Sequence, residues 1–195
     1  MKSATPATPN AIDPKGWLVG ARQIVSPNCD ERPVKTPVDA LVVHGITLPP
    51  GQFGHGQVDD LFTNRLQPGR HPFYAQIAAL RVSAHLLIER SGRITQYVSF
   101  DARAWHAGVS HLDGRDRVND FAVGIELEGT DHCPYAPAQY QCLADVVAAL
   151  MRHYPDMTRK RIVGHSDIAP GRKTDPGATF DWAWFGRLLE ARRCI

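Results

Sequence analysis

Three residues of metal-binding type occur in this sequence at places that could bring them together. His44 ends the apolar segment 40–44, and His165 follows the apolar segment 161–164. Asp175 comes ten residues after His165. Two imidazoles and one carboxylate can hold a zinc ion and leave one coordination position open for water, as in hydrolytic rather than structural zinc sites. The sequence therefore indicates a hydrolytic metal site.

Two further residues could act beside such a metal. Lys173 precedes Asp175 by two residues and would supply positive charge where an oxyanion develops, although a lone loop lysine is usually only solvated. Glu126 lies in the apolar segment 121–128, where it could serve as a general base. Alternation along that segment equally allows Glu126 and Glu128 to face solvent. The pattern alone leaves both interpretations of Glu126 open.

The remaining histidines and Trp105 are harder to interpret. The sequence has nine histidines, and a single one is more often a surface or satisfied polar residue than a ligand. His44 and His165 stand out because strand ends are where a rigid scaffold presents side chains to a site. His85 could be another ligand or could contact one. Trp105 could pack on a ligand or lie in the core.

Hydrophobic patterning predicts the elements that would position these residues. Residues 84–90 and 93–100, joined by Ser91-Gly92, are typical of a β-hairpin. Apolar residues at helical spacing over 136–154 predict the longest helix, and shorter helices are expected at 58–66, 72–81 and 180–193. Strands are expected at 40–44, 121–128 and 161–164. This mixture predicts an α/β domain with a central mixed sheet flanked by helices.

Composition and charge exclude several classes of protein. A chain of 195 residues suits one domain, and a net charge of +2 without a run of Lys and Arg does not indicate a nucleic-acid partner. No segment approaches the ~20 apolar residues of a membrane span, and no apolar run follows the first ten residues as in a secretory signal. We therefore expect a cytoplasmic monomer with four reduced cysteines and a flexible extension over residues 1–15.

Several motifs together resemble the zinc N-acetylmuramoyl-L-alanine amidases, which share a fold with the peptidoglycan recognition proteins. The resemblance covers residues 16–195 and implies a single zinc amidase domain with a mainly parallel sheet. The motifs are Leu41-Val-Val-His44, Leu80-Arg-Val-Ser-Ala-His85, Arg103-Ala-Trp-His-Ala-Gly108, Asn119-Asp-Phe121, Gly124-Ile-Glu-Leu-Glu-Gly-Thr130 and Lys173-Thr-Asp-Pro-Gly177.

The resemblance also implies an activity and a set of site residues. It implies one Zn²⁺ ion per chain on His44, His165 and Asp175, with Glu126 and Lys173 as catalytic residues. Positions matching substrate-binding residues of the family are Arg81, Trp105 and Arg117. The expected reaction hydrolyses the amide between the lactyl group of (1,6-anhydro-)N-acetylmuramic acid and L-alanine in small soluble muropeptides, during peptidoglycan recycling. The alternatives are a catalytically silent muropeptide sensor and an amidase that acts on intact cell wall.

Overall fold

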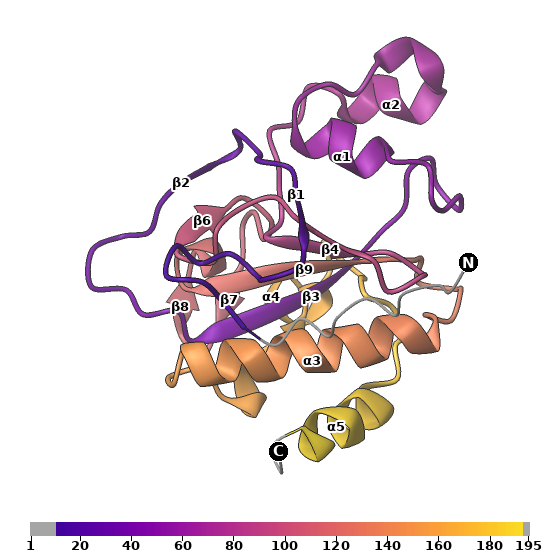
Figure 1. The fold of residues 1–195 in the computed structure, drawn as a ribbon. Helices are drawn as coiled ribbons and strands as arrows, with labels where there is room; N and C mark the ends of the chain where they lie inside the picture. Colours follow the sequence, from indigo (N-terminus) through magenta and orange to yellow (C-terminus); the bar gives the residue numbers. More distant parts are fainter. Residues whose placement is uncertain (1–10, 193–195) are drawn as a thin grey trace.

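The computed structural model describes residues 11–192. A six-stranded sheet runs through it (Figure 1). The strand order is β1-β5-β4-β9-β3-β10. The strands of this sheet are β1 (Arg22–Gln23), β3 (Ala40–Ile46), β4 (Leu86–Ile88), β5 (Ile94–Gln96), β9 (Ala122–Glu128) and β10 (Ile162–Gly164). Two small ribbons add β2 (Cys29–Glu31) with β6 (Ala102–Ala104), and β7 (His111–Leu112) with β8 (Arg115–Asp116).

The sheet is mixed and mainly parallel, as predicted. Strand β9 pairs in parallel with β3 and β4, and β10 pairs in parallel with β3. The hairpin β4–β5 supplies the antiparallel pair, and β1 joins β5 in parallel. The expected hairpin is confirmed, with paired strands shorter than the apolar runs that predicted them.

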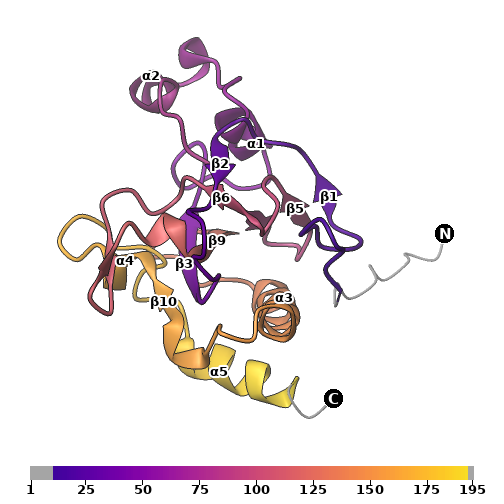
Figure 2. The same ribbon diagram turned by 90° about the vertical axis from the view of Figure 1, so that its left-hand side faces the viewer.

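Helices flank both faces of this sheet. They are α1 (Gln57–Phe62), α2 (Pro72–Ile77), α3 (Pro137–His153), α4 (His165–Ile168) and α5 (Trp182–Ala191), with 3-10 turns at Pro68–Arg70, Val118–Asp120 and Arg159–Arg161. The helices α3 and α5 lie on one side of the sheet, and α1 and α2 project from the other (Figures 1 and 2). The predicted helix 136–154 is confirmed almost to its ends, whereas α1, α2 and α5 are shorter than predicted.

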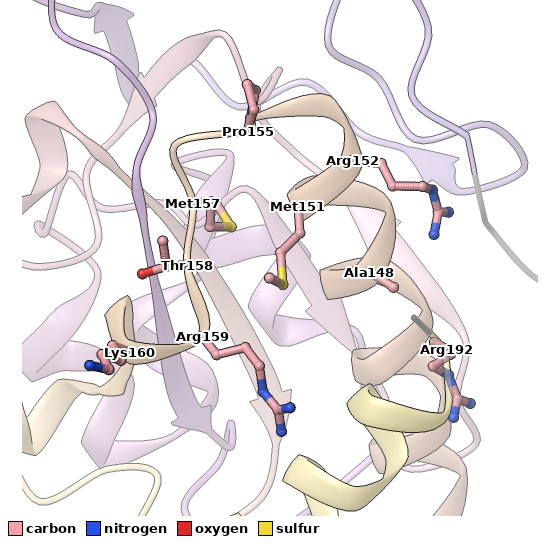
Figure 3. A pocket seen from close by; sticks show the side chains of 9 residues that line it. All are labelled: Ala148, Met151, Arg152, Pro155, Met157, Thr158, Arg159, Lys160 and Arg192. Atoms are coloured by element: carbon pink, nitrogen blue, oxygen red, sulfur yellow. The ribbon is translucent and has the colours of Figure 1, made fainter. Parts of the chain in front are cut away.

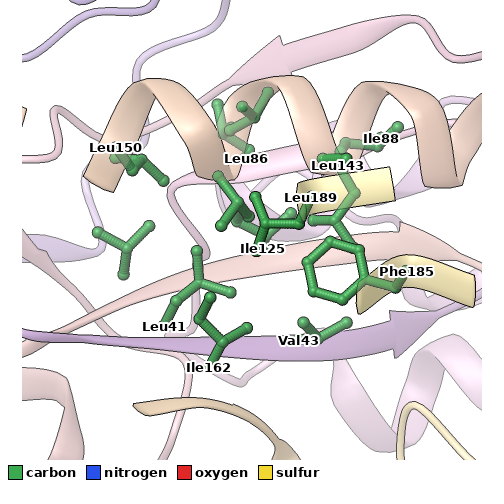
Figure 4. Packing of buried hydrophobic residues seen from close by; sticks show 14 of the residues in the cluster. Leu41, Val43, Leu86, Ile88, Ile125, Leu143, Leu150, Ile162, Phe185 and Leu189 are labelled. Carbon is green, nitrogen blue, oxygen red and sulfur yellow. The ribbon is translucent and has the colours of Figure 1, made fainter. Parts of the chain in front are cut away.

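The main core lies between the sheet and α3 with α5 (Figure 4). Val123, Ile125 and Leu127 of β9 point into it, which confirms that these alternate residues share one face. Gln139, on the first turn of α3, joins this layer to the sheet. Its side chain accepts from the Ala136 N–H and donates to the carbonyls of β4 and β9 at Ile88 and Glu128. The alternate side chains of β3 and β9 therefore project from the opposite face of the sheet, away from α3.

The N-terminal segment is held to the sheet through Gln96. The backbone N–H of Leu18 donates to Gln96 Oε1 at 2.6 Å, and Gln96 Nε2 donates to the Gly16 carbonyl at 3.0 Å. Ile12 forms a bridge with Leu18 and packs against the main core. Of the expected extension over 1–15, residues 11–15 are thus attached to the fold, and residues 1–10 lie outside the described residues.

Replacing Arg32 should destabilise the fold strongly. Its guanidinium donates to the carbonyls of Phe100, Asn119, Asp120 and Ala122 at 3.1–3.3 Å, and burial lowers its pKa to about 10. We expect Arg32→Met to lower the free energy of unfolding by about 2–4 kcal/mol, because buried carbonyls lose their donors. Arg93→Met, which removes an exposed pair with Glu89, should cost less than about 1 kcal/mol. Urea unfolding of both variants measures the difference, and equal losses would contradict it.

Candidate active site

His44 and Glu126 lie side by side on the face of the sheet opposite α3. In the parallel pairing of β3 with β9, His44 is in register with Glu126, and Leu87 of β4 continues the same row. Leu41 and Val43, the alternate residues of β3, point into the main core. The imidazole and the carboxylate therefore project to the same side from two adjacent central strands, which hold them rigidly.

His165 and Asp175 reach the same place from the next strand outward. Strand β10 pairs with β3 so that Gly164 is opposite Val43, and His165 follows at the start of α4. The Ser166 N–H donates to the Asp175 carbonyl at 3.0 Å, which fixes the Asp175 loop beside α4. The expected convergence of His44, His165 and Asp175 is thus observed.

The three side chains form a close triangle of possible ligand atoms. His44 Nδ1 lies 2.9 Å from His165 Nδ1, and Asp175 Oδ2 lies 3.2 Å from the former and 3.1 Å from the latter. Donor atoms around a tetrahedral zinc ion at 2.0–2.1 Å are separated by about 3.3–3.4 Å. Two imidazole nitrogens and a carboxylate oxygen at these separations fit a metal ion, and the cluster could hold one.

The protonation states of His44 and Asp175 suit metal binding. Burial lowers the pKa of His44 to about 4, so its imidazole is neutral near pH 7. Burial alone would raise the pKa of Asp175, but hydrogen bonds with His165 and His44 outweigh it and lower that pKa. Neutral imidazoles and an ionised carboxylate are the forms that bind a metal.

Glu126 is a buried carboxyl group with one oxygen that is unpartnered among the described residues. Its exposed fraction is 9%, and Oε2 has no hydrogen-bond partner within residues 11–192. Burial raises its pKa well above the ordinary value; the Asp175 carboxylate raises it further and Lys173 lowers it. The solvent-facing interpretation is wrong for Glu126 and also for Glu128, whose exposed fraction is 7%. A buried carboxyl group beside possible metal ligands has the properties of a general base.

Lys173 lies at the edge of the site. Its side chain is exposed, and its positive charge lowers the pKa of both His44 and Glu126. The Lys173 N–H donates to the Ala169 carbonyl just after α4, so the loop holds the lysine near the triangle. The ammonium group is available to an anionic group at the mouth of the site.

The structure brings two of the three expected substrate-binding residues into one network. Trp105 Nε1 donates to Asp30 at 3.1 Å, and Arg117 pairs with Asp120 at 3.1 Å. Arg103 bridges the two carboxylates, which joins Trp105 to Arg117. Arg81 is exposed and donates to the carbonyls of Ala79 and Leu80, outside this network.

Sequence reasoning assigned no role to two residues that support the triangle. His106 Nδ1 lies 3.0 Å from His44 Nε2, and Tyr135 OH donates to the Pro176 carbonyl at 2.9 Å, next to Asp175. Tyr135 is 41 residues from Pro176 in the sequence, so no local pattern could identify this contact. His85, left open between ligand and contact, accepts from the Gly124 N–H at 2.9 Å and is not part of the triangle.

A surface hollow of about 620 Å³ lies away from these residues (Figure 3). Met151 and Met157 line it, with Arg152, Arg159 and Arg192 among its basic residues. Arg159 and Arg192 are already paired with Glu190 and Asp145. None of the expected site residues lines this hollow.

The helices of the described residues 11–192 were also compared with what a membrane span requires. None of them has both the length and the apolar composition to span a bilayer.

Comparison with known proteins gives consistent matches over most of the chain. A sequence profile described as N-acetylmuramoyl-L-alanine amidase matches residues 34–178. The 1,6-anhydro-N-acetylmuramyl-L-alanine amidase AmpD of Escherichia coli (strain K12) is 60% identical over 175 residues, covering 90% of this chain and 95% of that protein. The Haemophilus influenzae AmpD is 56% identical, with coverages of 86% and 91%. A crystal structure of a selenomethionine AmpD derivative has a TM-score of 0.88 at 56% identity, covering 91% of this chain and 98% of that one.

Proposed function

This chain belongs to the N-acetylmuramoyl-L-alanine amidase family, and on that premise we propose that it is a zinc amidase of peptidoglycan recycling. Its substrate would be a small soluble muropeptide, cleaved between the lactyl group of 1,6-anhydro-N-acetylmuramic acid and L-alanine. The names of its relatives support this substrate. The observation that carries the proposal is the triangle of His44, His165 and Asp175 beside the buried Glu126, whose Oε2 has no partner among the described residues.

We assign the metal to the triangle and the proton transfers to Glu126. Zinc, held by Nδ1 of both histidines and by Asp175, would act as a Lewis acid and lower the pKa of water toward about 7. Glu126 would accept the proton of the attacking water and deliver it to the leaving amine of L-alanine. Its position in register with His44 supports this role, because the two groups project from adjacent strands.

Four further side chains would bind the substrate or stabilise the transition state. Lys173 would stabilise the oxyanion that develops on the lactyl carbonyl. Trp105 and Arg117 would contact the sugar and the stem peptide, since a guanidinium matches a carboxylate, and Arg81 would contribute from outside their network. One chain supplies every group, so we propose an active monomer. The free thiols of Cys29, Cys133 and Cys142 fit the reducing cytoplasm, where we place the reaction.

One assay with three substrates tests this function. Purified protein loaded with zinc is given 1,6-anhydro-N-acetylmuramyl tripeptide, N-acetylmuramyl tripeptide and intact peptidoglycan, with a chelator as control. We expect chelator-sensitive release of tripeptide, fastest from the anhydro substrate. Binding without cleavage would indicate a sensor, and faster release from intact peptidoglycan would indicate a cell-wall amidase.

Removing Lys173 should change both the rate and its pH dependence. We expect Lys173→Ala to lower kcat by about 10²–10³-fold, because one donor to the oxyanion is lost. Lys173 lowers the pKa of Glu126, so the loss of Lys173 raises that pKa. Because a general base acts in its ionised form, the ascending limb of the kcat/KM profile then moves to higher pH. The measurement is kcat and KM from pH 4 to 9, with the exposed Lys160→Ala as control. An effect on KM alone would assign Lys173 to substrate binding.

A further inference from the structure

The adjacent residues His106 and Ala107 contact the outer nitrogens of both candidate histidine ligands. His44 Nε2 lies 3.0 Å from His106 Nδ1, and His165 Nε2 lies 3.2 Å from the Ala107 carbonyl oxygen. In each histidine, the other nitrogen, Nδ1, faces the triangle. One short segment of chain therefore lies behind both ligands.

With a metal bound, these contacts fix which nitrogen of each ligand carries a proton. A carbonyl oxygen can only accept, so the Ala107 contact favours a proton on His165 Nε2, which leaves Nδ1 free to bind the metal. His44 must do the same to bind a metal through Nδ1, and its Nε2–H then donates to His106 Nδ1. In this arrangement His106 is neutral, with its own proton on Nε2.

A histidine at position 106 has a cost that an apolar residue would avoid. Its Nε2 is buried and has no hydrogen-bond partner among residues 11–192, although buried polar groups in proteins are nearly always partnered. The ring also needs a glycine beneath it, because a Cβ at Gly124 would clash with the His106 ring. An apolar residue at position 106 would avoid the unpartnered nitrogen but would give His44 no acceptor.

The backbone of this segment is itself fixed. Asn119 Oδ1 accepts from the N–H groups of both His106 and Ala107, at 3.1 and 2.8 Å. Arg172 also donates to the Ala107 carbonyl at 2.7 Å. The two acceptors are therefore held at constant positions relative to β3 and α4.

We propose that His106 is a positioning residue of the metal centre, which accepts the Nε2–H of His44 and so directs His44 Nδ1 toward the metal. The proposal rests on the metal site given under the proposed function. It explains why a further, partly buried histidine lies beside a ligand without joining the triangle. Ala107 performs the same task for His165 through its backbone.

Three substitutions separate this role from simple packing. His106→Asn places an amide oxygen near the position of Nδ1 and keeps an acceptor. His106→Leu has a similar shape and no acceptor, and His106→Gln is polar but carries its amide one carbon further out. The measurements are the Zn²⁺ dissociation constant by competition with a chromophoric chelator and the visible absorption spectrum of the Co²⁺ form. Thermal unfolding of the metal-free proteins reports whether each variant folds.

We expect His106→Leu and His106→Gln to bind Zn²⁺ about 10–100-fold more weakly than the wild type, with altered Co²⁺ spectra. His106→Asn should stay within about threefold of the wild type. Wild-type affinity in folded His106→Leu or His106→Gln would overturn the proposal, as would equal weakening in all three variants. A wild-type protein that binds no zinc would instead overturn the proposed function.

Discussion

Glu126→Gln is expected to keep the metal and lose nearly all turnover. The amide has the shape of the carboxyl group but cannot accept a proton, so we expect kcat to fall by about 10³–10⁴-fold. Because Glu126 is not one of the three residues of the triangle, zinc content should stay at one ion per chain. The measurement is single-turnover cleavage of the anhydro tripeptide together with metal analysis of the same sample.

Electrostatics explain why so large an effect is expected. Without a metal, burial holds the pKa of Glu126 well above its ordinary value and favours the neutral acid. A divalent cation on the triangle would offset the negative charges of Asp175 and Glu126, so the carboxylate could ionise in place. The resulting base would be desolvated and close to the attacking water, which makes it effective near neutral pH.

Glu128→Gln is the matched control for this prediction. Glu128 is buried on the same face of β9, two residues from Glu126, and accepts backbone N–H groups of Gly54 and Arg90. The amide oxygen of Gln can replace only one of the two carboxylate oxygens that accept these N–H groups, which costs some stability. Glu128 takes no part in the proposed proton transfer, so kcat should remain within about tenfold of the wild type. Near-wild-type turnover in Glu126→Gln would remove Glu126 from the chemistry, and metal loss in that variant would make it a ligand.

Local patterns in the sequence predicted most of the elements of this fold. The helix over 136–154 and the alternation of Val123, Ile125 and Leu127 follow from periodicity that a short window contains. The ends of α1, α2 and α5 were predicted too far out, because helix ends depend on tertiary packing as well as on propensity. Element types were therefore more predictable than their lengths.

The geometry of the site required the paired sheet. The register that places His44 beside Glu126 joins residues 82 positions apart, and no local window contains that information. His106 was missed for the same reason, since its contact with His44 spans 62 positions. Residue types at strand ends suggested the ligand set and the resemblance to a family assigned it, but only the structure shows which groups lie behind the ligands.

Asp175→Ala should abolish tight metal binding while leaving the protein folded. If a zinc-binding free energy of about 10–16 kcal/mol is shared by four ligands, losing one costs roughly 2.5–4 kcal/mol, or about 60- to 700-fold in affinity. Two neutral imidazoles would remain, without the negative charge that offsets the cation. Chelator competition measures the affinity, and the cleavage assay should show activity lost in proportion to occupancy.

Two matched variants distinguish ligand loss from the loss of a hydrogen bond. Asp116→Ala removes a similar histidine contact, with His111 at 2.9 Å, from an exposed site, and it should change neither affinity nor activity. Asp175→Cys offers a thiolate, which is also a zinc ligand, and should retain far more metal than Asp175→Ala. Stoichiometric zinc at wild-type affinity in Asp175→Ala would show that the carboxylate only orients the two histidines. The metal would then have to be held by His44 and His165 with a ligand outside the triangle.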